Sequence, residues 1–533
     1  MNIYSICDEL QKNVRLKKSI IAAWAMCLFA HGMTYFNLYY VGDRTTTFWS
    51  HEMWHYLAAK WGLDYVNGLT YFAYCPWLVG ILVCSFLTAS VYFIVIALDI
   101  QRGISIFLIA GIFATNVSFI SAHFYGTFEI LITLPIICLS VYAWSKANWG
   151  IAVRMFIEIM CIVLSLSIYG AYLPVGPSLV IMSILVQIVE KNIDIKCAWL
   201  KGIEYIISLI CGFVFYYLIS LFFLWIHKAH FLNYNGIDTL SKGISIRSFF
   251  YFCFCAYSRS IGYITGFYDG LKGNTPSFYP MPKALGTLLF LFFMILLFLK
   301  IKEIKNVGKI CLIVFLITIY PLSLGLIYVI SFNNVHALMI FTFCLFHVGI
   351  VKLVESMIDN EKVDVVLNRN FWMRKYLATL TLAILVFVVY RGVVVSNFTY
   401  TRLDNLFSAS ASIADRIIQR IEACDNIENA DTVIFVGEIA DNPYLSYSYL
   451  QDKDRITLLN GLPFVDANNG NSLTSTINLI NFYKETLNIP MKMRMFDEEV
   501  DGEYKNIIKE APTYPSSKSV FQYDNIIFVK LSD

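Results

Sequence analysis

The segment from Gly42 to Val66, GDRTTTFWSHEMWHYLAAKWGLDYV, gathers chemically capable side chains directly after the first long apolar run of the chain. Asp43 and Arg44 stand directly after its first residue. A carboxylate can take the proton of an acceptor hydroxyl, and an adjacent arginine can hold a departing phosphate. The pair could also be a solvated marker of a helix end, but charges at membrane depth tend to be functional. The segment therefore predicts a site for a substrate whose head group lies at a membrane surface.

The same segment contains HEMWH, from His51 to His55, which matches the H-E-x-x-H zinc motif. On one helix the two imidazoles would share a face with Glu52 beside them, as a metallopeptidase requires. No third ligand follows at a familiar spacing, so we assign no metal site and keep an intramembrane zinc peptidase as an alternative. The same helix would carry a contiguous apolar stripe suited to the bilayer surface, formed by Trp54, Leu57, Ala58 and Trp61.

Further polar residues lie near the predicted external surface. Glu129 stands at the start of a helix, where it would either meet substrate or stabilise the helix dipole. Arg259 would contact phosphate or snorkel to lipid head groups. Two tyrosines beside prolines predict a helix break that lines a cavity. The substrate-binding candidates outside the first segment are His123, Tyr125, Glu129, Tyr169, Tyr172 and Arg259.

The composition of the chain indicates that these residues belong to a membrane protein. The chain has 533 residues, of which 58% are hydrophobic and 15% are charged, and its mean hydropathy is +0.63. These values predict a polytopic α-helical membrane protein surrounded by lipids. The net charge of +2 gives no reason to expect a nucleic-acid partner. No Gly-rich phosphate loop follows a strand, and we predict no cofactor.

About eleven apolar runs are long enough to be spanning helices. The clustered lysines and arginines between them place the N-terminus inside, and an odd number of spans places the C-terminal tail outside. External loops are expected at 41–74 and 227–283, and Ser248–Phe267 is interpreted as re-entrant or interfacial. The predicted spans are Ile20–Tyr40, Cys75–Leu98, Ile104–Ser121, Phe128–Ser145, Ile151–Ile168, Leu173–Val189, Ile203–Ile226, Leu285–Leu299, Ile310–Ile330, Ala337–Val354 and Tyr376–Val395.

The character of the sequence changes after the last apolar run, so we expect two domains, at 1–396 and 397–533. Helical periodicity extends from Leu403 to Cys424, and TVIFVGEI at Thr432–Ile439 predicts a strand. Another helix is expected near Leu473–Leu487, and the last strand is NIIFVKL. The tail is therefore predicted to be a small α/β domain.

This layout resembles the serotype-converting O-antigen glucosyltransferases of bacteria and their phages, known as the Gtr type, which are membrane-embedded C-type glycosyltransferases. The resemblance rests on Asp43 after the first span, on AAKWGLDYV, on SIYGAYLP at Ser167–Pro174, and on the tail motifs YTRLDNLFSASASIADRIIQRIE and APTYPSSKSVFQYDNIIFVKL. Ala59, Lys60 and Trp61 stand where the family pattern has Gly-Arg before the tryptophan, so no role is assigned to Lys60.

The resemblance implies transfer of a hexose, typically glucose, from an undecaprenyl-phosphate sugar to lipopolysaccharide O-antigen. The reaction would take place at the periplasmic face of the bacterial inner membrane. Asp43 is then the leading general base and Glu52 the second catalytic candidate. Arg44, His51 and His55 would contact the phosphate or the sugar hydroxyls. A non-enzymatic carrier of lipid or polysaccharide is a further alternative.

Overall fold

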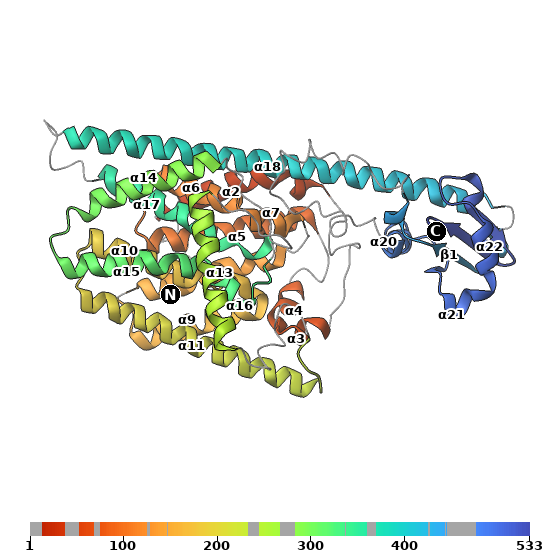
Figure 1. The fold of residues 1–533 in the computed structure, drawn as a ribbon, viewed down its shortest axis with the longest axis horizontal. Coiled ribbons are helices and arrows are strands. Elements are labelled where there is room, and N and C mark those ends of the chain that lie inside the picture. The colour runs from red at the N-terminus through yellow and green to blue at the C-terminus, as the bar shows by residue number, and fades with distance from the viewer. Residues whose placement is uncertain are drawn as a thin grey trace.

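The computed structural model describes residues 13–37, 53–68, 75–124, 128–146, 148–232, 245–266, 283–335, 337–359, 369–424, 427–442, 444 and 476–533. A helical bundle occupies one end of the elongated molecule, and a small domain with a β-sheet occupies the other (Figure 1). The long helix α18 (Arg369–Glu422) runs along the bundle and continues into the small domain. The predicted boundary between 396 and 397 therefore lies inside one continuous helix.

The first part of the bundle is built on α2, which packs against α5 and α6. The side chain of Asn13 caps α2 by accepting a hydrogen bond from the backbone N–H of Leu16, and Pro76 opens α5. Helix α9 packs between α8 and α11. It approaches α11 closely at Gly212, where an added Cβ would lie 2.5 Å from the Cγ2 atom of Ile162. The elements are α2 (Val14–Phe36), α5 (Pro76–Ala97), α6 (Gly103–Ala114), α7 (Val117–Phe124), η1 (Phe128–Ile132), α8 (Thr133–Ser145), α9 (Ile151–Tyr169), η2 (Gly170–Tyr172), α10 (Val175–Glu190) and α11 (Ile195–Ile226).

In the second part of the bundle, α17 and α18 pack against each other and against α14. In the described part of the chain, eight helices are long and apolar enough to cross a membrane, or nine if α6 and α7, which meet at 54°, form one broken span. Two shorter apolar helices, at Ile130–Ser145 and Val175–Glu190, lie where spans are also predicted. The total of eleven spans stays a prediction. The elements are α13 (Ile246–Thr265), α14 (Lys283–Ile301), α15 (Val307–Leu324), α16 (Ile327–Ile330), η3 (Ala337–Met339), η4 (Phe341–Cys344), α17 (Leu345–Asp359) and α18.

Helix α13, which coincides with the predicted re-entrant or interfacial segment, is not among the candidate spans of the described chain. It runs across the direction of α14 and α15 rather than along them (Figure 1). It buries Arg259 and Ser260 and exposes Phe250 and Phe254. One face of α13 is thus buried and another is exposed, and its predicted re-entrant or interfacial place in the bilayer stays a prediction.

The prediction of one continuous helix through HEMWH and the following tryptophan is wrong. Helix α3 (Met53–Leu57) ends and α4 (Trp61–Gly68) begins after a turn in which Ala59 has a φ of 56°. The backbone N–H of Lys60 donates to the carbonyl of His55 at 2.7 Å, which closes α3 as a left-handed cap does. The expected apolar stripe from Trp54 to Trp61 is therefore broken, because its two halves belong to separate helices.

The C-terminal domain contains a four-stranded sheet of order β2-β1-β4-β3. The central strand β1 is parallel to β2 and β4, and β3 is antiparallel to β4. The end of α18 packs on this sheet through Ile413, Ile417 and Ile421, all buried. The predicted small α/β domain is thus confirmed as a helix-covered sheet. Its elements are β1 (Thr432–Val436), α20 (Thr476–Asn481), a π-helical turn (Phe482–Thr486), β2 (Met493–Met495), α21 (Glu498–Asp501), α22 (Lys505–Glu510), β3 (Val520–Tyr523) and β4 (Ile526–Lys530), with short turns η6 (Ile427–Asn429), η7 (Ile439–Asp441), η11 (Gly502–Tyr504) and η12 (Ser517–Ser519).

Candidate functional site

Helices α3 and α4 follow the segment that contains Asp43, and they are fixed to the bundle by α9 and α11. The Trp61 indole N–H donates to the Ser220 hydroxyl of α11 at 3.3 Å, and the Tyr216 hydroxyl donates to the backbone carbonyl of Ala59 at 3.0 Å. Gly62 faces α9 so closely that an added Cβ would lie 2.2 Å from the Oγ atom of Ser167. The position of α4 is therefore set by a contact that tolerates no side chain.

A buried carboxylate joins the two short helices. Asp64 is fully buried, with one oxygen 3.3 Å from Nδ1 of His55 and the other accepting a hydrogen bond from the Tyr56 hydroxyl at 3.1 Å. Partial burial and the nearby charge of Asp64 raise the pKa of Tyr56 to about 12, so this phenol stays a hydrogen-bond donor at neutral pH. Nδ1 of His55 faces the carboxylate and donates to it, which fixes the ring and leaves Nε2 on the opposite edge. This pairing orients an imidazole for proton transfer or for binding a substrate hydroxyl.

Lys60 connects this pair of helices to one of the predicted tyrosines. Its ammonium lies 4.8 Å from the ring centroid of Trp54 and 5.6 Å from that of Tyr169. These are distances at which a cation interacts favourably with an aromatic face. The rings of Tyr169 and Tyr172 are 5.5 Å apart, so the structure places His55 and both tyrosines in one continuous region.

The broken segment η3–η4 is a meeting point that the sequence did not predict. Helix α7 packs against both η3 and η4, η2 packs against η3, and α13 packs against η4. The ring of Tyr172 lies 5.2 Å from that of Phe341, and the ring of Tyr263 lies 5.0 Å from that of Phe343. The elements that carry His123, Tyr172 and Arg259 therefore converge here.

His123 itself lies in a packed polar cluster inside the bundle. Its ring is stacked on that of His31 at 4.2 Å, its Nε2 lies 3.1 Å from the Tyr35 hydroxyl, and its Nδ1 lies 2.9 Å from a backbone carbonyl of its own helix. His31 in turn has Nδ1 at 2.5 Å from the Tyr400 hydroxyl and Nε2 at 2.7 Å from a backbone carbonyl of α6. Since a carbonyl only accepts, each imidazole donates to it and accepts from a tyrosine. Two neutral imidazoles thus tie α2, α7 and α18 together.

The family comparison covers most of this region. A family model described as Glucosyl transferase GtrII matches residues 32–351, which is well over half of the chain. The chain belongs to the glucosyl transferase GtrII family. Its expected resemblance to a Gtr glucosyltransferase is confirmed, and the chain is a membrane protein of a glycosyltransferase family. No curated protein matches it.

The GtrII match begins in α2, ends in α17 and includes every predicted site residue. Of these residues, His55, Tyr169 and Tyr172 lie in one region, His123 is in the α2–α7–α18 cluster, and Arg259 is on the inner face of α13, 7% exposed. Glu129 falls in η1. The described residues contain no group of three or more His, Cys, Asp or Glu that could hold a metal ion. The residues Asp43, Arg44, His51, Glu52 and Tyr125 lie outside the described residues.

Sequence reasoning missed Asp64 as a partner of His55 and missed the η3–η4 break. Asn333, at a φ of 68°, and Asn334 lie in the link already predicted between Ile330 and Ala337, so they gave no signal for the short turns η3 and η4 that open the predicted span Ala337–Val354. Asp64 carried no signal either, because its spacing of nine residues from His55 matches neither a helical face nor a known ligand pattern.

Proposed function

We propose that this GtrII-family protein transfers a hexose, with glucose as the leading candidate, from an undecaprenyl-phosphate sugar to lipopolysaccharide O-antigen. The reaction takes place at the periplasmic face of the bacterial inner membrane and leads to serotype conversion. The family match supports this proposal, because it covers residues 32–351 and with them all the residues that were chosen for chemistry.

In this proposal Asp43 takes the proton of the acceptor hydroxyl, and Arg44 and Arg259 hold the phosphate that leaves. Asp43 belongs to the segment that joins α2 to α3, and both of these helices are fixed in the bundle. His55, held by Asp64, offers a hydrogen-bond acceptor to a sugar hydroxyl. Tyr169 provides an aromatic face for a sugar ring.

The C-terminal domain holds the acceptor polysaccharide and performs no chemistry in this proposal. It stands beyond the end of the bundle on α18 (Figure 1). A reporter joined after Asp533 tests its predicted periplasmic location. Signal from a reporter that works only in the cytoplasm would place the domain, and with it the proposed reaction, on the wrong side of the membrane.

The deciding experiment measures hexose transfer by membranes that contain the full-length protein, supplied with different undecaprenyl-phosphate hexoses and an O-antigen acceptor. We expect Asp43→Asn to lower transfer by about 10²- to 10⁴-fold, since it keeps the size of the side chain but removes the base. Glu52→Gln is the matched control, because Glu52 would be the general base of the zinc-peptidase alternative. Near-full transfer by Asp43→Asn together with loss in Glu52→Gln would overturn the assignment of the base.

A further inference from the structure

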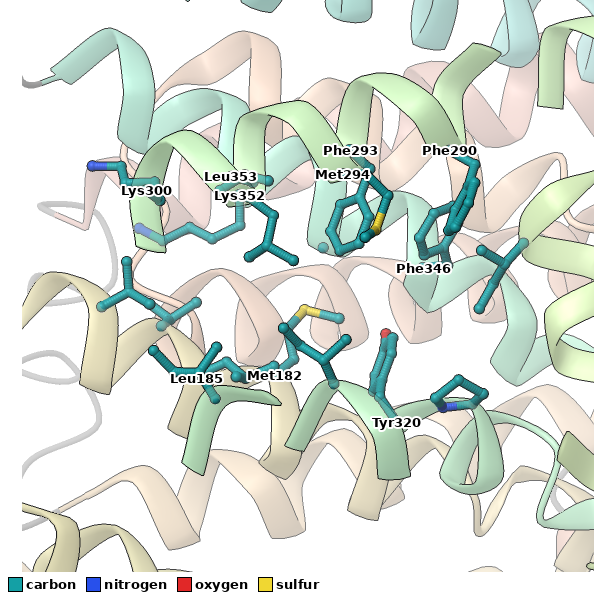
Figure 2. A pocket seen from close by; sticks show the side chains of 18 of the residues that line it. Met182, Leu185, Phe290, Phe293, Met294, Lys300, Tyr320, Phe346, Lys352 and Leu353 are labelled. Atoms are coloured by element: carbon teal, nitrogen blue, oxygen red, sulfur yellow. The ribbon is translucent and has the colours of Figure 1, made fainter. Parts of the chain in front are cut away.

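A cavity of about 290 Å³ lies between α10, α13, α14, α15 and α17. Its walls are almost entirely apolar, and none of the residues chosen for the transfer reaction lines it. Figure 2 shows the side chains that face one another across it. They include Met182, Leu185, Phe293, Met294, Phe346 and Leu353.

One end of this cavity carries two buried lysines, Lys300 of α14 and Lys352 of α17, each 5% exposed. Both side chains extend toward that end in Figure 2. The Lys352 ammonium lies 3.0 Å from the Glu190 carboxylate and donates to the backbone carbonyl of Asp99 at 3.2 Å. The Lys300 ammonium reaches the Glu303 carboxylate only at 3.8 Å.

These charges leave an excess of positive charge at the apolar cavity. Glu303 is already bound by Arg374 at 2.5 Å, so it offers Lys300 little compensation. Two lysines and one carboxylate line the cavity itself. A buried ammonium with three donors stabilises an anion strongly, because few other partners compete for it.

The length of the cavity indicates how long an apolar chain the bound anion carries. On α14 it extends from Phe290 to Lys300, which is about 15 Å of helix at ~1.5 Å per residue. This distance is about half of the ~30 Å hydrocarbon thickness of a bilayer, or the depth of one leaflet. One acyl chain of a phospholipid fits that depth, whereas an undecaprenyl chain is much longer.

We propose that this cavity is a binding site for an anionic phospholipid, with one acyl chain between α10, α14, α15 and α17 and the phosphate at Lys300 and Lys352. The bound chain fills the apolar cavity between these helices. The site does not depend on the proposed transfer reaction, and its lipid is a resident ligand rather than the sugar donor.

Native mass spectrometry of the full-length protein in detergent micelles tests the proposal. Separate samples are incubated with phosphatidylglycerol, phosphatidylcholine or undecaprenyl phosphate, and then with pairs of these lipids. We expect retained phosphatidylglycerol that neither other lipid displaces. Equal retention of phosphatidylcholine, or displacement by undecaprenyl phosphate, would contradict the proposal without any variant being needed.

Two pairs of variants locate the site. Lys300→Gln is expected to lower phosphatidylglycerol retention by roughly tenfold or more, while Lys302→Gln, at an exposed position two residues away, leaves it unchanged. Leu353→Trp fills the cavity and is expected to expel the acyl chain. Leu291→Trp adds the same bulk on an exposed face of α14 and serves as its control. Loss of retention in the controls, or no loss in either test variant, would place the lipid elsewhere.

Tyr320 gives an independent check on the chemistry of the occupant. Its hydroxyl is buried, has no hydrogen-bond partner among the described residues, and points into the cavity (Figure 2). An acyl chain has no group to pair with it, so Tyr320→Phe is expected to retain phosphatidylglycerol fully. A loss of binding in this variant would mean that a polar ligand occupies the cavity instead.

Discussion

Replacing Asp64 by asparagine tests whether the buried carboxylate positions His55 for catalysis. The change preserves size, but it removes a negative charge that is fully buried and that faces Nδ1 of His55 at 3.3 Å and the Tyr56 hydroxyl at 3.1 Å. Asparagine keeps one acceptor oxygen and presents an amide N–H₂ in place of the other. One of the two hydrogen bonds to a charged group is therefore lost.

A hydrogen bond to a charged group contributes about 1.5–3 kcal/mol. If this energy is expressed in the transition state, the rate of hexose transfer falls by roughly 10- to 150-fold. Tyr56→Phe removes only a phenol hydroxyl from a side chain that is not fully buried, and we expect a loss below about tenfold. Neither variant removes the proposed base, so both remain more active than Asp43→Asn.

The assay is the transfer measurement described above, with kcat and KM determined separately for Asp64→Asn, His55→Gln and the double variant. If Asp64 acts through His55, the two single losses are not additive, and the coupling is about 0.5–3 kcal/mol. Additive losses, or full activity of Asp64→Asn beside an inactive His55→Gln, would refute the idea that the carboxylate orients the imidazole.

Three further outcomes are expected. Gly62→Ala places a methyl group against Ser167 and costs about 1–3 kcal/mol of α4 docking; we expect reduced transfer, partly restored by Ser167→Ala. Tyr400→Phe leaves Nδ1 of His31 without its donor, so we expect a loss of about 1–3 kcal/mol of stability, seen as a lower unfolding temperature; the exposed Tyr390→Phe is expected to leave that temperature unchanged. Hydrogen bonding by Arg494 lowers the pKa of Asp501 in the folded chain. The Asp501 carboxylate therefore stabilises the C-terminal domain fully at pH values above the ordinary aspartate pKa of about 3.9. This stabilisation is lost as the pH falls through the lower pKa of the folded state. The protection factors of the β2 amides, which correct for the pH dependence of intrinsic exchange, are therefore expected to fall below about pH 4 in the native chain. In Asp501→Asn they are expected to be lower already at pH 7, with no further acid-dependent step from this group.

The helices and the tail could be predicted because their signals are local. An apolar run of about 20 residues indicates a spanning helix whatever its neighbours are. The β-branched and aromatic residues of TVIFV indicate a strand by the same local logic, and β1 forms there. The helical pattern from Leu403 to Cys424 was likewise found, as the last part of α18.

The rest of the site depends on contacts between distant parts of the chain. The turn at Ala59 that separates α3 from α4 is held by the Tyr216 hydroxyl, which is 157 residues away in sequence. His31 and Tyr400 are 369 residues apart and meet only in the folded bundle. Helical periodicity carries no information on either contact. It therefore predicted one helix where the structure has α3 and α4.

In the proposed function, the continuity of α18 gives the C-terminal domain a way to serve the reaction without taking part in its chemistry. Tyr400 fixes this helix to α2 through His31, one turn before α2 ends and the segment with Asp43 begins. From Tyr400 to the first sheet-packed residue, Ile413, the helix rises about 20 Å, at ~1.5 Å per residue. The sheet is thus held at a set distance beyond the contact between His31 and Tyr400. A polymeric acceptor can cover that distance, so a rigid helix is better suited than a flexible linker to present one of its sugars repeatedly at the same place.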